Sequence, residues 1–141
     1  FDRWGEGDAS ALDRTELHGF LLFAGKAGCS LCHGGWRFTD DKLHDIGRRE
    51  TVPPTHDPAA PASRPALKTP TLRELAWTAP YMHDGAFPTL DAVVRHYAEE
   101  IVDRPTLAPV LRRRARLAPG DRAAIVAFLR TLSSSGPPAA P

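Results

Sequence analysis

The sequence predicts an all-α domain with little strand and a long proline-rich loop. Apolar residues recur at helical spacing in three stretches, which lie near residues 14–24, 90–101 and 119–132. Residues 50–70 instead are rich in proline and have almost no periodicity, as in a long surface loop. The chain has 141 residues, of which 42% are hydrophobic and 25% charged. This size and composition are typical of one globular domain.

The first helix is predicted to begin after Asp13. Glu16 follows three residues later, in the pattern of a capping box, and apolar residues then recur at helical spacing. Gly25 and Gly28 should end this helix. We therefore expect it to lead directly into Cys29.

Two further elements are expected in the middle of the chain. A short helix is predicted over residues 69–75, because a proline is well tolerated in a first helical turn. Thr89 should cap a second helix, whose apolar positions place Tyr97 on the inward side. His96 precedes Tyr97 and therefore points about 100° away around the helix. We do not expect these two side chains to share a direction.

The last helix is predicted to begin near Pro119 and to pack across the first helix. Phe20 and Phe128 are the expected contact between them. Beyond this helix the chain is rich in Ser, Gly, Pro and Ala, a composition that cannot form a core. We therefore predict a domain over residues 1–132 and a flexible tail over residues 133–141.

The segment from Cys29 through Cys32 to His33 has the pattern C-x-x-C-H and is the most specific chemical signal in the chain. Two thiols at this spacing can each add to one vinyl group of a haem, and the adjacent imidazole can then bind the iron. A disulfide, a thioredoxin-like redox pair and half of a zinc site are the alternatives. Zinc normally needs four protein ligands, and the chain has two cysteines. We predict one covalently bound haem, wrapped by a cytochrome c-like helical domain.

The opposite face of the iron needs a ligand from further along the chain. Met82 offers a soft thioether, which favours Fe(II) and suits electron transfer. Tyr97 offers a hard, anionic oxygen, which favours Fe(III). Each has an ordinary alternative, because methionine often fills gaps and tyrosine often packs in a core. The remaining candidates are the histidines His44, His56, His83 and His96.

Charge and hydropathy limit the partners and the location. The formal net charge is +1, so no global field favours nucleic acid. A local run of Arg112, Arg113, Arg114 and Arg116 suggests a solvated helix face, or alternatively a surface for an acidic redox partner. No stretch is long and apolar enough to span a membrane. The chain starts at Phe1 without an initiator Met, which suggests processing or cropping. Because haem is attached to such thiols outside the cytoplasm, we expect a periplasmic location.

Several motifs occur together in an order typical of one family. They are Phe1-Asp2-Arg3-Trp4, Gly25-Lys26-Ala27-Gly28-Cys29, Phe38-Thr39-Asp40, His44-Asp45-Ile46-Gly47, Lys68-Thr69-Pro70-Thr71-Leu72-Arg73 and Thr78-Ala79-Pro80-Tyr81-Met82-His83-Asp84-Gly85. From Phe1 to about Leu132 the chain resembles the C-terminal haem domain of the bacterial dihaem cytochrome c peroxidases and their MauG-type relatives. The segment ending in His-Asp-Gly is much more specific than the haem motif, which every c-type cytochrome shares.

The resemblance implies an electron-transfer haem with His33 as its proximal ligand. In this family the distal ligand lies in the helix after the His-Asp-Gly loop, at the position of Tyr97, where peroxidases usually have Met and MauG-like members have Tyr. The resemblance therefore favours Tyr97 over Met82.

The resemblance also implies contacts around the haem. A calcium ion would lie between two domains, bound partly by the main-chain carbonyls of Thr78 and Pro80, since oxygen ligands suit a hard cation. Arg73 is expected to pair with a haem propionate, because a guanidinium binds a carboxylate at two points.

Family members have two haem domains, and the haem that reacts with peroxide lies in the other one. Since the chain has one C-x-x-C-H, we expect it to pass electrons between a redox partner and a peroxidase or MauG-like centre outside it. It would then be part of a longer dihaem enzyme or a redox subunit. One alternative is a diffusible monohaem cytochrome with His33 and Met82 on the iron and no catalytic activity. Another is a catalytic chain in which Tyr97 merely packs and His83 acts as acid and base.

Overall fold

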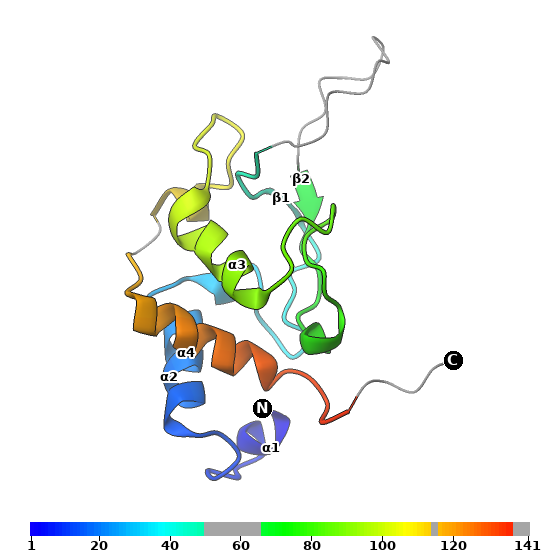
Figure 1. Cartoon of the computed structure of the whole chain (residues 1–141), viewed down its shortest axis with the longest axis vertical. Coiled ribbons are helices and arrows are strands. Elements are labelled where there is room, and N and C mark those ends of the chain that lie inside the picture. The colour runs from blue at the N-terminus through cyan, green and yellow to red at the C-terminus, as the bar shows by residue number, and fades with distance from the viewer. Residues whose placement is uncertain (50–65, 114–115, 137–141) are drawn as a thin grey trace, which may run out of the picture.

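The computed structural model describes residues 1–49, 66–113 and 116–136, and its described part is mainly helical (Figure 1). The α-helices are α1 (Asp2–Gly5), α2 (Arg14–Ala24), α3 (Leu90–Arg95) and α4 (Pro119–Arg130). Three short 3₁₀ helices, η1 (Cys29–Leu31), η2 (Leu75–Trp77) and η4 (Pro109–Arg113), lie between them, and the π-helix η3 (His96–Glu100) continues α3. No helix in these three ranges is long and apolar enough to cross a membrane.

A small antiparallel sheet joins β1 (Leu43–Asp45) and β2 (Ala66–Lys68). Leu43 pairs with Lys68 and Asp45 pairs with Ala66. The prediction of loop over residues 50–70 is therefore wrong at Ala66–Lys68, because strands of three residues are too short to show a periodic pattern. The rest of that predicted loop, residues 50–65, lies outside the described residues, and so does His56.

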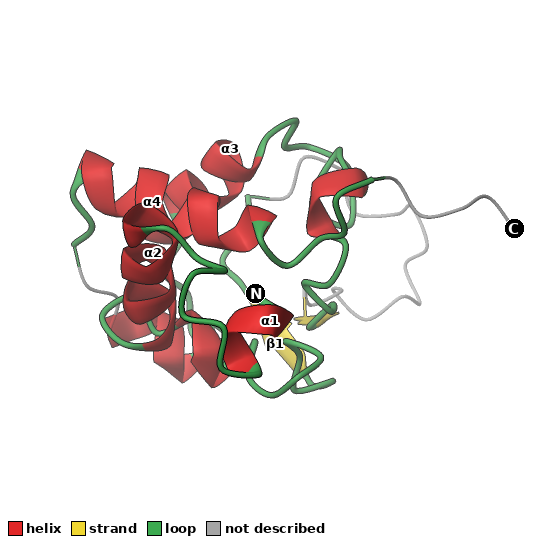
Figure 2. Ribbon diagram, turned by 90° about the horizontal axis from the view of Figure 1, so that it is seen from below, coloured by secondary structure: helices red, strands yellow, loops and turns green. Residues whose placement is uncertain are grey.

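Helices α2 and α4 cross at close range and form the base of the domain (Figures 1 and 2). The predicted capping box is confirmed, since the Glu16 amide donates to Asp13 Oδ1 over 2.8 Å and the Asp13 amide donates to Glu16 Oε2 over 2.8 Å. Gly19 permits the close approach, because a Cβ there would lie 1.9 Å from the carbonyl oxygen of Ala124. The predicted start of the last helix at Pro119 is also confirmed.

The core between these helices is an aromatic cluster around Phe128, whose side chain is completely buried. The predicted contact with Phe20 is confirmed, with ring centroids 5.4 Å apart. Phe1, Phe23 and Phe38 surround the same ring, at centroid distances of 5.6, 5.1 and 6.2 Å. This cluster ties α2 and α4 to the segment that follows Cys32 and His33.

The helix predicted over residues 69–75 is wrong. The chain there makes its hydrogen bonds to other segments: Thr71 Oγ1 donates to the Arg37 carbonyl over 2.6 Å, and the Glu74 amide donates to the Leu132 carbonyl over 3.1 Å. The Glu74 amide used in this way cannot donate to the carbonyl four residues earlier, as an α-helix requires. The helical turn begins only at Leu75, as the short η2.

Helix α3 begins where it was predicted to begin. Thr89 Oγ1 accepts the Ala92 amide over 3.2 Å, and α3 then passes into η3, which contains both His96 and Tyr97. His96 is 2% exposed although it does not follow the apolar stripe. It is buried because the loop after β1 covers its side of the helix, where its Nε2 lies 3.1 Å from the Ile46 carbonyl oxygen.

The first residues of the predicted tail contact the domain. The Ser134 amide donates to Glu74 over 3.0 Å, and Ser133 Oγ accepts the Ala76 amide over 2.9 Å. Residues 137–141 lie outside the described residues. The boundary at residue 132 stays a prediction.

Candidate haem site

The C-x-x-C-H segment follows α2 directly, as predicted. Gly28 has a positive φ of 69°, a conformation that glycine adopts without strain, and this residue turns the chain into η1. The His33 amide donates to the Cys29 carbonyl over 2.9 Å. The segment is therefore one tight turn that gathers both thiols and the imidazole.

The pKa values of the two thiols differ from those of a redox-active cysteine pair. Burial raises the pKa of Cys29 to about 12, and burial also raises the pKa of Cys32. Reactive C-x-x-C cysteines instead have lowered pKa values, because the thiolate is the nucleophile. The thioredoxin-like alternative is thus disfavoured.

A backbone carbonyl orients the His33 ring. Its Nδ1 lies 2.9 Å from the Phe38 carbonyl oxygen, so Nδ1–H donates to it, and the Pro70 backbone is a second hydrogen-bond partner that raises the pKa of His33. Burial lowers the pKa of His33, which favours the neutral form that binds metal. This is the arrangement expected of a proximal haem ligand.

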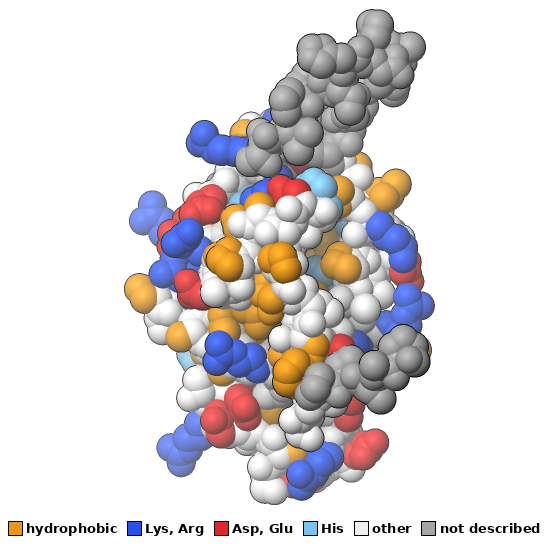
Figure 3. Space-filling model, turned by 45° about the vertical axis from the view of Figure 1, so that its right-hand side comes forward, with side chains coloured by type: hydrophobic (Ala, Val, Ile, Leu, Met, Phe, Trp, Pro, Cys, Tyr) orange, Lys and Arg blue, Asp and Glu red, His pale blue; other side chains and the backbone are white. Residues whose placement is uncertain are grey.

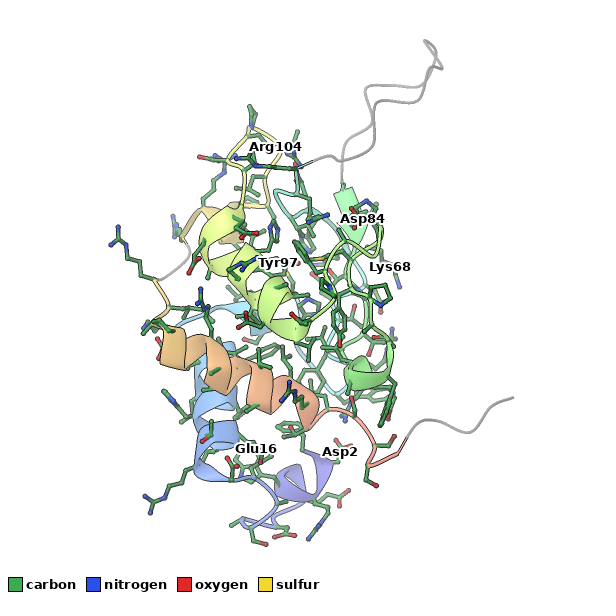
Figure 4. The ribbon with its side chains drawn as sticks, viewed as in Figure 1. Asp2, Glu16, Lys68, Asp84, Tyr97 and Arg104 are labelled. Atoms are coloured by element: carbon green, nitrogen blue, oxygen red, sulfur yellow. The ribbon has the colours of Figure 1, made fainter. Side chains whose placement is uncertain are left out.

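Tyr97 lies on the π-helix η3 and is half-buried (Figure 4). Burial raises its pKa, and the nearby thiols of Cys29 and Cys32 raise it further, whereas the Arg48 charge lowers it. Tyr97 therefore lies near the two thiols. Met82 is half-buried in a loop that the pairing of Tyr81 with Phe87 closes.

The other predicted ligands lie in different surroundings. His44 Nε2 is 2.7 Å from Asp40 Oδ2, and the hydrogen bond from His44 holds the pKa of Asp40 well below its usual range. The ligand atoms of Asp40, His44 and Cys32 lie within 4.8 Å of one another, so this group could hold a metal ion. His83 is exposed.

The residues expected to contact propionate and calcium have known neighbours but untested roles. Arg73 Nη1 donates to Asp2 Oδ1 and Oδ2 over 2.7 and 2.8 Å, and its Nε donates to the Trp36 carbonyl over 2.9 Å. Thr78 and Pro80 are exposed. The assignments of Arg73, Thr78 and Pro80 stay predictions.

Sequence analysis missed a partly buried ion pair beside this site. Arg48 Nη2 donates to Asp84 Oδ2 over 2.7 Å, although 36 residues separate them. Both belong to short polar segments that resemble exposed turns. The position of Asp84 in the His-Asp-Gly loop was the one available signal, and it did not indicate the partner.

Apolar side chains are exposed next to the C-x-x-C-H turn. Leu31 is 67% exposed and Trp36 is 78% exposed. An apolar cavity of about 340 Å³ adjoins the turn, lined by His33, Trp36, Phe23 and Phe38 among others. On the face drawn in Figure 3, hydrophobic side chains gather in the middle and charged side chains surround them.

Two thiols three residues apart, an imidazole and a nearby phenol are groups that could hold a c-type haem. The chain is similar to the methylamine utilization protein MauG of Methylorubrum extorquens, at 44% identity over 95% of this chain and 39% of that protein. It is similar to the cytochrome c551 peroxidase of Nitrosomonas europaea, at 35% identity over 97% of this chain and 40% of that protein. No protein-family model matches the chain.

Two solved structures of similar proteins have a similar fold. A MauG-like protein associated with microbial copper homeostasis superposes with a TM-score of 0.76 at 28% identity, over 95% of this chain and 51% of that one. The diheme peroxidase BthA from Burkholderia thailandensis has the same fold, with a TM-score of 0.69 at 24% identity, over 90% of this chain and 44% of that one.

The chain belongs to the family of MauG and the dihaem cytochrome c peroxidases. It spans about 40% of the length of the MauG and peroxidase relatives named above, which is consistent with one domain of such a protein. A role within a haem oxidoreductase family follows, and haem c is the supported cofactor.

Proposed function

We propose that this chain is the electron-transfer haem domain of a MauG-like or dihaem peroxidase system, with His33 and Tyr97 as the axial ligands. The observation that carries the proposal is that Tyr97 lies near Cys29 and Cys32, while the His33 Nδ1–H donates to the Phe38 carbonyl and so orients the ring. The haem would supply one-electron redox chemistry between Fe(III) and Fe(II).

The chain's own residues would hold and tune that cofactor. Cys29 and Cys32 would bind the porphyrin edge covalently, and Phe38 would orient the His33 ring through the 2.9 Å hydrogen bond. Tyr97 would lose its proton on binding iron, because metal ligation requires the deprotonated oxygen. A phenolate favours Fe(III), so we propose a low potential.

Electrons would cross at the exposed surface of the C-x-x-C-H turn. Leu31 lies between the two cysteines and is 67% exposed, and Trp36 is 78% exposed close to His33. Such apolar surface beside a cofactor suits contact with a redox protein. We place the peroxide-reacting haem in another domain or subunit, and we propose a periplasmic location and a calcium ion on the carbonyls of Thr78 and Pro80.

Optical and EPR spectra of the haem-loaded protein test the ligand assignment. We expect Tyr97→Phe to change the ferric spectrum and Met82→Ala to leave it unchanged. The reverse result would favour the second candidate, a diffusible cytochrome with His33 and Met82 ligation. Tyr81→Phe is the matched control, because its hydroxyl donates to the Leu75 carbonyl over 3.2 Å and is not a proposed ligand.

A metal ion on Cys32, Asp40 and His44 is the competing use of the same segment. Mass spectrometry of the denatured protein separates the two. Covalent haem stays on the chain, whereas a coordinated ion is lost. If the protein produced with a haem-attachment system has no added haem mass and binds zinc that His44→Ala abolishes, the haem proposal is wrong.

A further inference from the structure

Arg48 places a cation in the interior of the domain. The residue is 7% exposed, its Nη2 donates to Asp84 Oδ2 over 2.7 Å, and its guanidinium carbon lies 4.4 Å from the centroid of the Phe87 ring. A buried charge is costly unless ion pairs and hydrogen bonds compensate it. Asp84 and the face of the Phe87 ring offset part of the cost of burying the guanidinium charge.

The Nε–H group of Arg48 lacks a hydrogen-bond acceptor in the described part of the chain. It is buried and has no hydrogen-bond partner among the residues that the structure describes. The guanidinium cannot easily turn away, because its Nη2 donates to Asp84 Oδ2 and its carbon lies over the Phe87 ring. Arg104 Nη1 also anchors the Arg48 backbone by donating to its carbonyl over 3.2 Å. A buried donor held in this way is unfavourable unless a ligand accepts from it.

The surroundings connect this donor to the haem site. The Phe87 ring that lies under Arg48 contacts the His96 ring at a centroid distance of 5.6 Å, and His96 contacts the Tyr97 ring at 5.2 Å. The Arg48 charge also lowers the pKa of Tyr97. In the view of Figure 4, Tyr97 and Asp84 both lie in the upper half of the molecule. Arg48 therefore adjoins the region that Tyr97 faces.

We propose that the Arg48 Nε–H binds a propionate carboxylate of the covalently attached haem, and that Asp84 holds the guanidinium in position. This inference rests on the proposed haem site. Cys29 and Cys32 would fix the vinyl side of the porphyrin, so the propionates must meet a different segment of the chain. A carboxylate is the acceptor that arginine binds best. Arg73, the partner expected from sequence, already binds Asp2 and the Trp36 carbonyl.

The assignment gives Arg48 a positioning and tuning role. With the cation present, one of the two negative charges of the propionate and Asp84 is compensated. Removing the cation leaves two anionic groups near the iron and favours Fe(III). We expect Arg48→Gln to shift the equilibrium between the two oxidation states by about tenfold toward Fe(III), which is a fall of about 59 mV for a one-electron couple.

The experiment uses the haem-loaded chain and begins with its haem content by mass. If the unsubstituted protein carries no covalent haem, the proposed function fails and not merely this inference. With haem present, the readouts are the midpoint potential and the propionate-bending bands in resonance Raman spectra. Arg48→Gln should shift both. Arg3→Gln is the matched charge-removal control, because this side chain is 76% exposed, and it should shift neither.

Two outcomes overturn the proposal: propionate bands unchanged in Arg48→Gln, or bands shifted by Arg73→Gln as much as by Arg48→Gln. If Arg48→Gln does not fold, Arg48→Lys decides the question. Lysine keeps the positive charge near Asp84 but lacks the Nε–H. Its propionate bands should therefore shift while its potential stays closer to that of the unsubstituted protein, and unchanged bands contradict the assignment.

Discussion

Asp45 should make the stability of the domain depend on acid pH. Its side chain is 2% exposed and accepts hydrogen bonds from Arg104, Thr106 and the Gly47 amide. The Arg104 hydrogen bond is the main reason that the pKa of Asp45 falls from 3.8 to about 2. A shift of nearly two units corresponds to about 2 kcal/mol.

The direction of this pH dependence follows from proton binding. Because the pKa of Asp45 is lower in the folded state, the unfolded state binds more protons as the pH falls. The contribution is therefore fully present above about pH 4 and lost as the pH falls toward 2. For these two pKa values, about 1 kcal/mol is lost by pH 3.

Guanidinium chloride unfolding, followed by circular dichroism between pH 7 and pH 2.5, measures this dependence. The difference in unfolding free energy between the unsubstituted protein and Asp45→Asn should shrink by at least about 1 kcal/mol over that range. Comparing the two proteins removes the pH effects that they share. Asp41→Asn is the control: Asp41 binds Lys68 and Arg37 but is 42% exposed, so the difference should depend much less on pH. A difference for Asp45→Asn that is constant with pH refutes the reasoning.

Three substitutions test the packing by the same unfolding measurement. Gly19→Ala should destabilise by more than about 2 kcal/mol, because the new Cβ meets the Ala124 carbonyl, whereas Gly120→Ala, with no heavy atom within 4 Å of its Cβ, should change little. Phe128→Ala should cost about 3–5 kcal/mol, since it opens a cavity in the aromatic cluster. Thr89→Ala removes the cap of α3 and should cost about 1 kcal/mol, and a loss below 0.3 kcal/mol would contradict that role.

Elements with strong local signals were predictable from sequence. The capping box at Asp13 and the stripe that includes Phe128 depend on residues close together in the chain, so the pattern contains their cause. The strands around Leu43 and Ala66 could not be predicted in this way. Their hydrogen bonds join segments more than twenty residues apart, and each strand has only three residues.

The candidate site likewise contains residues that the sequence could predict and residues that it could not. Cys29, Cys32 and His33 are adjacent in sequence, so their common chemistry is visible without a structure. The value of Tyr97 as a ligand came from a family resemblance, because an inward tyrosine has no pattern of its own. Arg48 was missed because its burial depends on Asp84 and Phe87, which the fold brings to it from another loop.

The charges of the proposed site explain why both Tyr97 and Arg48 matter. A porphyrin contributes two negative charges and a Tyr97 phenolate contributes one, so they balance Fe(III) and leave Fe(II) with one uncompensated negative charge. A buried site disfavours that charge, which stabilises the oxidised state. Arg48 is a buried cation whose charge lowers the pKa of Tyr97, and it compensates one of the two negative charges of Asp84 and the proposed propionate. The phenolate thus lowers the potential and the guanidinium limits the decrease. Tyr97→Phe and Arg48→Gln should therefore shift the potential in opposite directions.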